Sequence, residues 1–319
     1  MRQYLLRRFL LAIPTLFLVS VTIFLVLRVI PGDVAMIILS GSEGSSVANP
    51  QQMADLRHRL GLDQTLPQQY VSWATGILRL DPGRSLKTDR PIADEIAGAL
   101  PVTLELIVFS TLVSFCIAIP LGVLSAMHQD TEMDYIFRVA TVGGLAMPVF
   151  WTATLVILIL TMAFNWMPPL GFVTLFEDPL KNIQQMVWPV LVLGYYQAAV
   201  LGRMTRSQML EVLRQDYVRT ARAKGLREIT LIYAHALKNA LLPIVTLSGL
   251  QFGVLIGGTM LLEIIFVLPG LGTTLIESIL SRDYPIVQTI VLLIAVLQVL
   301  VNLAVDMTYA WLDPRIRYT

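Results

Sequence analysis

The sequence is poor in charge and almost free of cysteine. Only 14% of its 319 residues are Asp, Glu, Lys or Arg, whereas a soluble globular chain has about 25%. Hydrophobic residues make up 55%, and the mean hydropathy is +0.70. This deficit of charge predicts a chain that lies in lipid rather than one with a larger water-soluble core. The single cysteine, Cys116, excludes an internal disulfide.

Several motifs of catalysis and ligand binding are also missing. The sequence has no Gly-x4-Gly-Lys-Ser/Thr phosphate loop, so we expect no ATP binding by that route. It has no His-Glu-x-x-His and no Gly-x-Ser-x-Gly, and its histidines fall in separate polar segments: His58, His128 and His235. A net charge of +1 gives no basic field that would attract nucleic acid. We therefore expect no catalytic residue, no metal site and no nucleic-acid partner.

The apolar residues are gathered in long runs. The first, Phe9–Leu27, has nineteen residues without charge, more than the roughly 7–15 of a signal-peptide core, so we expect an uncleaved first span. Four further runs are clear: Thr103–Ala126, Ile136–Phe164, Asn239–Phe266 and Pro285–Trp311. Another, Trp188–Gly202, is short for a span of about 20 residues and is expected to borrow length from residues 203–213. The sequence thus predicts an all-α polytopic membrane protein with six transmembrane helices.

A polar insert of residues 31–99 follows the first run. Helical spacing predicts one helix from Asn49-Pro50 to Gly61, a second over Leu66–Leu80, and a third opened by Arg90-Pro91. Two readings of the insert remain open, a folded loop that caps the spans and a docking platform for a soluble partner.

Basic residues are concentrated in one segment between two apolar runs. Residues 203–238 hold eight Lys or Arg against three acids. A cationic side chain at the centre of a span costs roughly 2.5–3.5 kcal/mol, so this segment is expected to stay in water. The positive-inside rule then places it in the cytoplasm together with both termini. It places residues 31–99, 165–187 and 267–284 on the other side.

The basic segment also has a helical pattern. Tyr217, Ala221 and Leu226 lean to one side, and Gly225 occupies a position where a helix could end in a left-handed C′ turn. This pattern indicates a short exposed helix that contacts a partner. The other interpretation is a loop that only sets the topology.

Specific motifs in the chain resemble ABC importer permeases. Arg219-Thr220-Ala221, three residues, Gly225 and later Leu242-Pro243 resemble their coupling-loop signature, although Arg219 replaces the usual Glu, Thr220 replaces the first Ala, and the gap to Leu-Pro is longer. These departures resemble the dipeptide/oligopeptide subfamily. The likeness covers essentially the whole chain and extends to Pro31-Gly32-Asp33, Gly83-Arg84-Ser85, Leu268-Pro269-Gly270-Leu271-Gly272 and the tail Asp313–Tyr318.

The resemblance implies a type I ABC importer permease fold, divided into residues 1–30, an outer loop 31–99, a transmembrane domain 97–308 with the coupling loop 203–242, and a cytoplasmic tail 309–319. It implies a multi-pass permease of the inner membrane that forms half of a pathway for di- or oligopeptides or glutathione. The implied partners are a second permease, an extracytoplasmic binding protein and two ATPases, which would hold ATP and Mg. Nickel chelates, opines or oligosaccharides remain alternative substrates, and an ATP-independent secondary transporter is the other alternative.

The resemblance assigns the coupling to the ATPases to one set of residues: Arg219, Thr220, Ala221, Arg222, Lys224 and Gly225. Small residues four apart, at Gly249, Gly253 and Gly257, predict close helix packing, either within the chain or at a seam with another subunit. Four nearby residues are candidates for lining the pathway: Met147, Phe150, Gln251 and Met260. The few ionisable residues in the spans lie near their ends, which favours passive gating over proton coupling.

Overall fold

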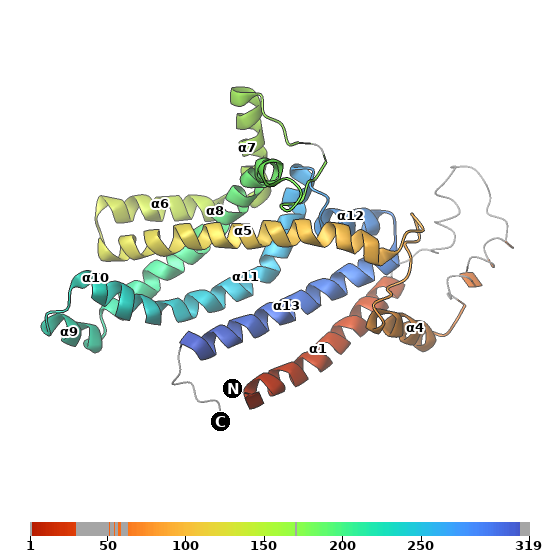
Figure 1. The fold of residues 1–319 in the computed structure, drawn as a ribbon, viewed down its shortest axis with the longest axis horizontal. Coiled ribbons are helices and arrows are strands. Elements are labelled where there is room, and N and C mark those ends of the chain that lie inside the picture. The colour runs from red at the N-terminus through yellow and green to blue at the C-terminus, as the bar shows by residue number, and fades with distance from the viewer. Residues whose placement is uncertain are drawn as a thin grey trace. The chain divides into compact units, whose positions relative to one another are not determined.

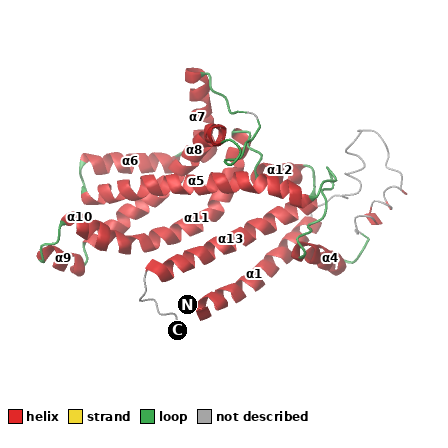
Figure 2. Ribbon diagram, viewed as in Figure 1, coloured by secondary structure: helices red, strands yellow, loops and turns green. Residues whose placement is uncertain are grey.

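A computed structural model describes residues 2–29, 63–169 and 171–312, with single residues 51, 54, 57 and 58. All regular structure in this part of the chain is helical (Figures 1 and 2), and its one β-bridge joins Arg84 to Pro91. The prediction of an all-α protein is confirmed. The chain divides into two compact units. Unit 1 contains residues 101–272 and 300–312, and unit 2 contains residues 2–100 and 273–299 within the described ranges.

In the described part of the chain, four helical segments are long and apolar enough to cross a membrane by length and composition. They are α1 (Arg2–Val29), α5 (Ile92–Met127), α11 (Leu237–Ile265) and α13 (Tyr284–Leu312). They coincide with four of the predicted spans, because each predicted run lies almost entirely inside one helix. The described part of the chain therefore confirms a polytopic membrane protein.

The predicted span Ile136–Phe164 is not one continuous helix. It forms α6 (Glu132–Ala146) and α7 (Val149–Phe164), which meet at an angle of 102°. The break falls at Met147, where the backbone is extended (ψ 124°), and at Pro148, the residue that precedes α7. Proline restricts the residue before it to extended conformations and has no N–H to donate, so the helix ends there.

The short run Trp188–Gly202 lies inside α8 (Pro179–Leu213), a helix of 35 residues. As expected, α8 continues through residues 203–213 without a break. Helix α8 is not among the helices of the described chain that are long and apolar enough to span a membrane. Asp178 caps its start by accepting a hydrogen bond from the Lys181 backbone N–H. That bond and the Lys181 side chain hold the pKa of the Asp178 carboxyl below its usual value.

Unit 1 is built around α8. Helix α11 packs against α8 and α7, and α6 packs against α8. Closely packed residues also join α5 to α8, since Gly194 of α8 lies against Val113 of α5. The fully buried side chains along this packing include Leu193, Leu201 and Ile244.

Unit 2 contains the helix predicted over Leu66–Leu80, which is confirmed as α4 (Leu66–Leu78). Helix α4 packs against α1 through aromatic rings, with the centroids of Phe24 and Tyr70 5.4 Å apart. The Tyr70 hydroxyl also lies 2.8 Å from the Ser20 hydroxyl. The helix expected over 49–61 lies largely outside the described residues.

The helix predicted after Arg90-Pro91 begins at Ile92, but it continues as α5 to Met127. The third helix of the insert and the second span are therefore one helix, with no linker between them. The loop before it is fixed within unit 2, because the Ser85 hydroxyl donates to the Asp283 carboxylate at 2.5 Å. Helix α12 (Leu271–Leu280) lies in the segment that was expected to be a short outer loop.

Candidate functional site

The short helix predicted in the basic segment is α9 (Asp216–Ala223), and it ends in the predicted turn. Gly225 has a φ of +80°. Its N–H donates to the carbonyl of Arg222 at 3.0 Å, and the N–H of Leu226 donates to the carbonyl of Ala221 at 3.3 Å. These two bonds make a Schellman turn, in which glycine is favoured because a side chain disfavours positive φ.

One face of α9 packs on the chain, and the other lies exposed. Val218 is fully buried in a cluster of apolar residues from α5, α8 and the start of α11, and the half-buried Ala221 packs against the same cluster. The other residues assigned to coupling are exposed: Arg219, Thr220, Arg222, Lys224 and Gly225. Since Ala221 faces its own chain, the exposed Thr220 is the better probe of contact with a partner.

The chain after α9 returns to the membrane helices through an irregular helical segment. Arg222 pairs with Glu228 of α10 (Glu228–Thr230), with 2.6 Å between Nη2 and Oε1. A π-helical turn, η1 (Leu231–Ala236), then leads directly into α11. Such turns often occur at functional sites, but the apolar pattern of this segment did not distinguish it from an ordinary α-helix.

A buried ion pair joins three helices near α9. Asp134 of α6 is fully buried, and its Oδ1 lies 2.6 Å from Nε of Arg206 on α8. Ser125 of α5 donates to the same carboxylate at 2.5 Å, while Arg138 lies farther away, at 3.7 Å. We did not predict this cluster from the sequence, because no local spacing links residues 72 positions apart.

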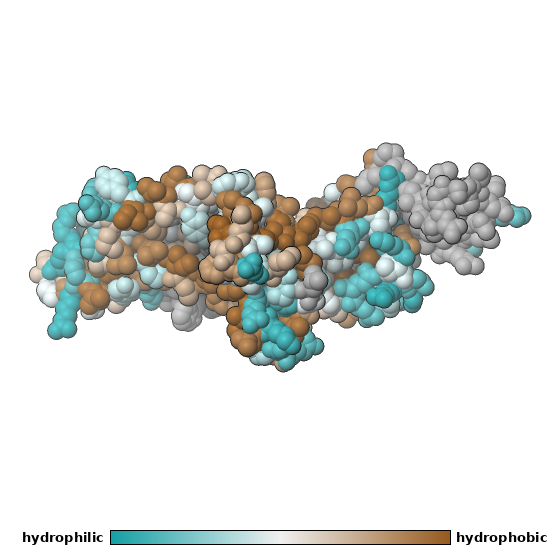
Figure 3. Space-filling view, turned by 90° about the horizontal axis from the view of Figure 1, so that it is seen from above, coloured by the Kyte–Doolittle hydropathy of each residue, from teal (hydrophilic) through white to brown (hydrophobic). Residues whose placement is uncertain are grey.

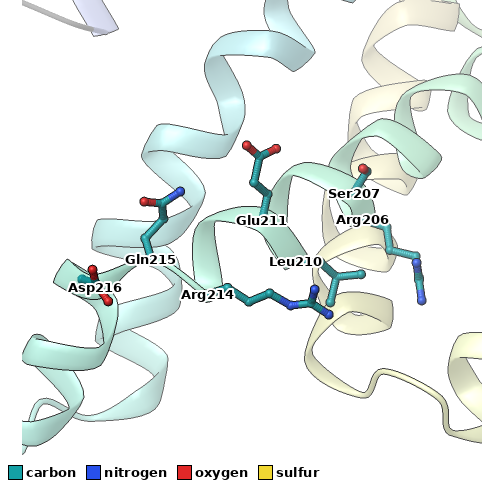
Figure 4. Close-up of a pocket in the computed structure, with 7 residues that line it drawn as sticks. All are labelled: Arg206, Ser207, Leu210, Glu211, Arg214, Gln215 and Asp216. Carbon is teal, nitrogen blue, oxygen red and sulfur yellow. The ribbon is translucent and has the colours of Figure 1, made fainter.

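An open cavity of about 550 Å³ extends from Arg206 on α8 to Asp216, the first residue of α9 (Figure 4). It is lined by the last turns of α8 and the first residues after it: Arg206, Ser207, Leu210, Glu211, Arg214, Gln215 and Asp216. Its lining combines two guanidinium groups with two carboxylates and an amide, so it suits a polar side chain rather than an apolar ligand. Hydrophilic side chains also gather at this end of unit 1 in Figure 3, where Figure 1 places α9.

The three glycines of α11 lie in different environments. A Cβ on Gly249 would lie 2.5 Å from a Val305 methyl of α13, so this glycine packs inside unit 1. Gly253 and Gly257 are exposed, and a Cβ on Gly257 would meet no atom within 4 Å. Only the first of the three is therefore used for packing within the described chain.

None of the four candidate pathway residues lines the cavity beside α9. Met147 and Phe150 flank the bend between α6 and α7 and are 42% and 47% exposed. Gln251 and Met260 are half-buried on α11. In the part of the chain that the structure describes, no group of three His, Cys, Asp or Glu side chains could hold a metal ion.

Comparison with known proteins identifies the family. Residues 118–318 match the family described as "Binding-protein-dependent transport system inner membrane component", and residues 1–107 match the N-terminal segment of such components. The chain is 40% identical over its full length to the dipeptide transport system permease protein DppB of Escherichia coli, covering 99% of that protein. It is 39% identical to DppB of Alkalihalophilus pseudofirmus, with all of both chains covered.

A third relative is also named as a peptide permease. The di/tripeptide transport system permease protein DppB of Pseudomonas aeruginosa is 38% identical, with 100% of this chain and 99% of that protein covered. The resemblance seen in the sequence motifs is thereby confirmed, and with it a transport subunit rather than an enzyme. The chain belongs to the inner-membrane components of binding-protein-dependent transport systems, as a multi-pass permease subunit of an ABC importer.

Proposed function

We propose that this permease forms half of a pathway that imports peptides across the inner membrane. The full-length likeness to dipeptide and di/tripeptide permeases carries the proposal. The relatives do not favour nickel chelates, opines or oligosaccharides, and family membership argues against an ATP-independent carrier. The complete importer would add a second permease, two ATPases that hold ATP and Mg, and an extracytoplasmic binding protein. We also propose that the chain is divided into an N-terminal part of residues 1–30, an outer loop 31–99, a transmembrane domain 97–308 and a tail 309–319.

Within this assembly, α9 is the element that enters a groove of an ATPase. Its exposed face offers Arg219, Thr220 and Lys224, while Val218 anchors its other face to the chain. The cavity beside α9 would accept a polar side chain of the same partner. Both features lie on one end of unit 1, so a single partner surface could use them together.

The packing of α9 supports a mechanical role. Val218 shares its apolar cluster with Val123 of α5, Met209 of α8 and Leu231 of η1. Displacement of α9 by an ATPase would therefore press on the ends of three membrane helices at once. Because packed cores resist continuous deformation, such a push is transmitted as a shift of whole helices, as alternating access requires.

The first prediction concerns transport. In a strain that lacks its own dipeptide importer, we expect uptake of a radiolabelled dipeptide only when this permease is expressed with its second permease, ATPases and binding protein. The permease alone should neither hydrolyse ATP nor move the dipeptide, because its sequence has no phosphate loop. Uptake by the permease alone in proteoliposomes would contradict the proposal.

The second prediction concerns topology, with both termini and residues 203–238 in the cytoplasm. Phe176, 96% exposed in the segment 165–187, and the exposed Gln215 are each replaced by cysteine in a Cys116→Ala background. An impermeant thiol reagent applied to intact spheroplasts should label position 176 and leave position 215 unlabelled. The reverse pattern would invert the proposed orientation.

The third prediction concerns the seam with the second permease, which we place on the exposed Gly253 and Gly257. Gly257→Leu should leave the chain folded, because its side chain points into open space, and should reduce co-purification of the second permease. Gly249→Leu is the matched control, since its side chain would collide with Val305 and lower the thermal stability of the permease itself. If the second permease still co-purifies with Gly257→Leu in undiminished amount, this face of α11 contacts lipid instead.

A further inference from the structure

Unit 2 contains a cluster of hydrogen-bond donors that the transport mechanism does not use. Its centre is Arg28, at the end of α1 and one residue beyond the apolar run Phe9–Leu27. The Arg28 guanidinium lies 4.7 Å from the centre of the Phe24 ring, and its Nε donates to Gln69 of α4 at 3.1 Å. Among the described residues no carboxylate pairs with Arg28, so its terminal nitrogens keep donors to spare.

Three further donors of unit 2 have no hydrogen-bond partner in the described part of the chain. They are the indole N–H of Trp73, the hydroxyl of Tyr284 and the side-chain amide nitrogen of Gln288. Tyr284 and Gln288 are themselves 6% and 2% exposed. An unpartnered buried donor costs about 1–3 kcal/mol, which indicates a site that a ligand completes.

Contacts within unit 2 connect these donors. The Trp73 ring packs 6.2 Å from the Phe24 ring, on which Arg28 also lies. The Tyr284 hydroxyl lies within electrostatic range of the Arg28 guanidinium. Gln288 is one helical turn beyond Tyr284 on α13 and therefore shares its face. Arg28 and Trp73 are half-buried, so the cluster opens to the surface through these two side chains.

The surroundings place the cluster at a membrane–water interface. Helix α4 has no charged residue, and it exposes Leu78 at 83% and Val71 at 56%. Tyr70 and Trp73 lie on the same short helix, and such aromatic residues are enriched where lipid headgroups meet the acyl chains. Helix α4 thus has the character of a helix that lies in this interface, next to the end of a spanning helix.

We propose that Arg28, Trp73 and Tyr284 bind the phosphate group of a membrane phospholipid. A phosphodiester carries one negative charge and several acceptor oxygens, which match an unpaired guanidinium surrounded by neutral donors. Basic pockets between membrane helices bind lipid headgroups in this way. Asp283, next to Tyr284, forms no ion pair with Arg28 among the described residues; its Oδ2 accepts from the Ser85 hydroxyl and from the Lys87 N–H, and its Oδ1 has no hydrogen-bond partner among them.

The test uses the full-length permease, purified in an uncharged detergent and analysed by native mass spectrometry with added phosphatidylglycerol. We expect a retained phospholipid in the native protein and a loss of about tenfold in its affinity in Arg28→Gln, because a charged hydrogen bond is removed. Tyr284→Phe, which deletes only the hydroxyl, should weaken binding in the same direction. Arg84→Gln is the matched control, since Arg84 is exposed and paired with Asp89.

Two further ligands test whether the bound phosphate group belongs to a phospholipid or is free inorganic phosphate. Diacylglycerol with the same acyl chains lacks the phosphate and should not be retained. Millimolar inorganic phosphate should not displace the phospholipid, because it lacks the acyl chains that contact the exposed apolar residues of α4. Equal retention of diacylglycerol, full displacement by inorganic phosphate, or unchanged binding in both Arg28→Gln and Tyr284→Phe would each overturn the proposal.

Discussion

Replacing Gly225 by Val should uncouple the permease from its ATPases without reducing its amount in the membrane. Gly225 closes α9 at a φ of +80°, a conformation that a β-branched side chain strongly disfavours. Strain of this kind costs on the order of 1–3 kcal/mol, so the turn would open and the end of α9 would move. We expect at least about a tenfold loss of ATPase in affinity pull-downs, with a matching loss of uptake.

Two controls separate this effect from a general loss of stability. Gly225→Asn should retain the ATPases, because asparagine tolerates the left-handed conformation. Gly83→Val introduces the same strain at a φ of +88°, in a loop outside the coupling segment, and also has no atom within 4 Å of the new Cβ. It should therefore leave ATPase binding unchanged. Wild-type pull-down in Gly225→Val would show that this turn does not determine docking.

Replacing Asp134 by Asn should destabilise the permease itself. Asp134 is fully buried and pairs with Arg206 at 2.6 Å, so its removal leaves a guanidinium without its counter-charge. Breaking a fully buried pair costs about 3–5 kcal/mol, and we expect the lower end of this range because the Arg206 side chain is 18% exposed and lines the open cavity beside α9. For a chain of this size we expect a fall on the order of 10 °C in the thermal unfolding midpoint of the detergent-solubilised protein.

The matched variants use the same cluster. The double variant Asp134→Leu/Arg206→Met should recover most of the lost stability, because an apolar pair of similar volume can replace a buried ion pair. Arg138→Gln should have a small effect, since Arg138 is 40% exposed and lies 3.7 Å from the carboxylate. An unchanged midpoint in Asp134→Asn would show that the pair does not hold α5, α6 and α8 together.

Sequence patterns predicted the helices well where local rules determine them. The apolar runs define α1, α5, α11 and α13, and Gly225 ends α9 in the expected turn. The bend at Pro148 was only partly predictable, because a proline inside a span can either kink the helix or end it. The sequence did not indicate the angle of 102° between α6 and α7, which depends on how both helices pack.

The sequence predicted which segment of the chain forms the candidate site, but it did not predict how the side chains of that site are arranged in three dimensions. The basic cluster and the glycine located α9, yet the inward orientation of Ala221 depends on packing around Val218. The pair of Asp134 and Arg206 joins positions 72 residues apart, and no periodicity relates them. The π-helical turn before α11 also lacks a residue pattern that distinguishes it from an α-helix.

The central claim is that the exposed face of α9 contacts an ATPase, and photo-cross-linking in the assembled importer tests it directly. A benzophenone amino acid is placed at Thr220, on the exposed face of α9, and separately at Phe176 as a control on the segment proposed to lie outside. Irradiation of native membranes should give a cross-linked product of the permease and the ATPase from position 220, and none from position 176. Failure of position 220 to cross-link to the ATPase in a transport-competent importer would contradict the account.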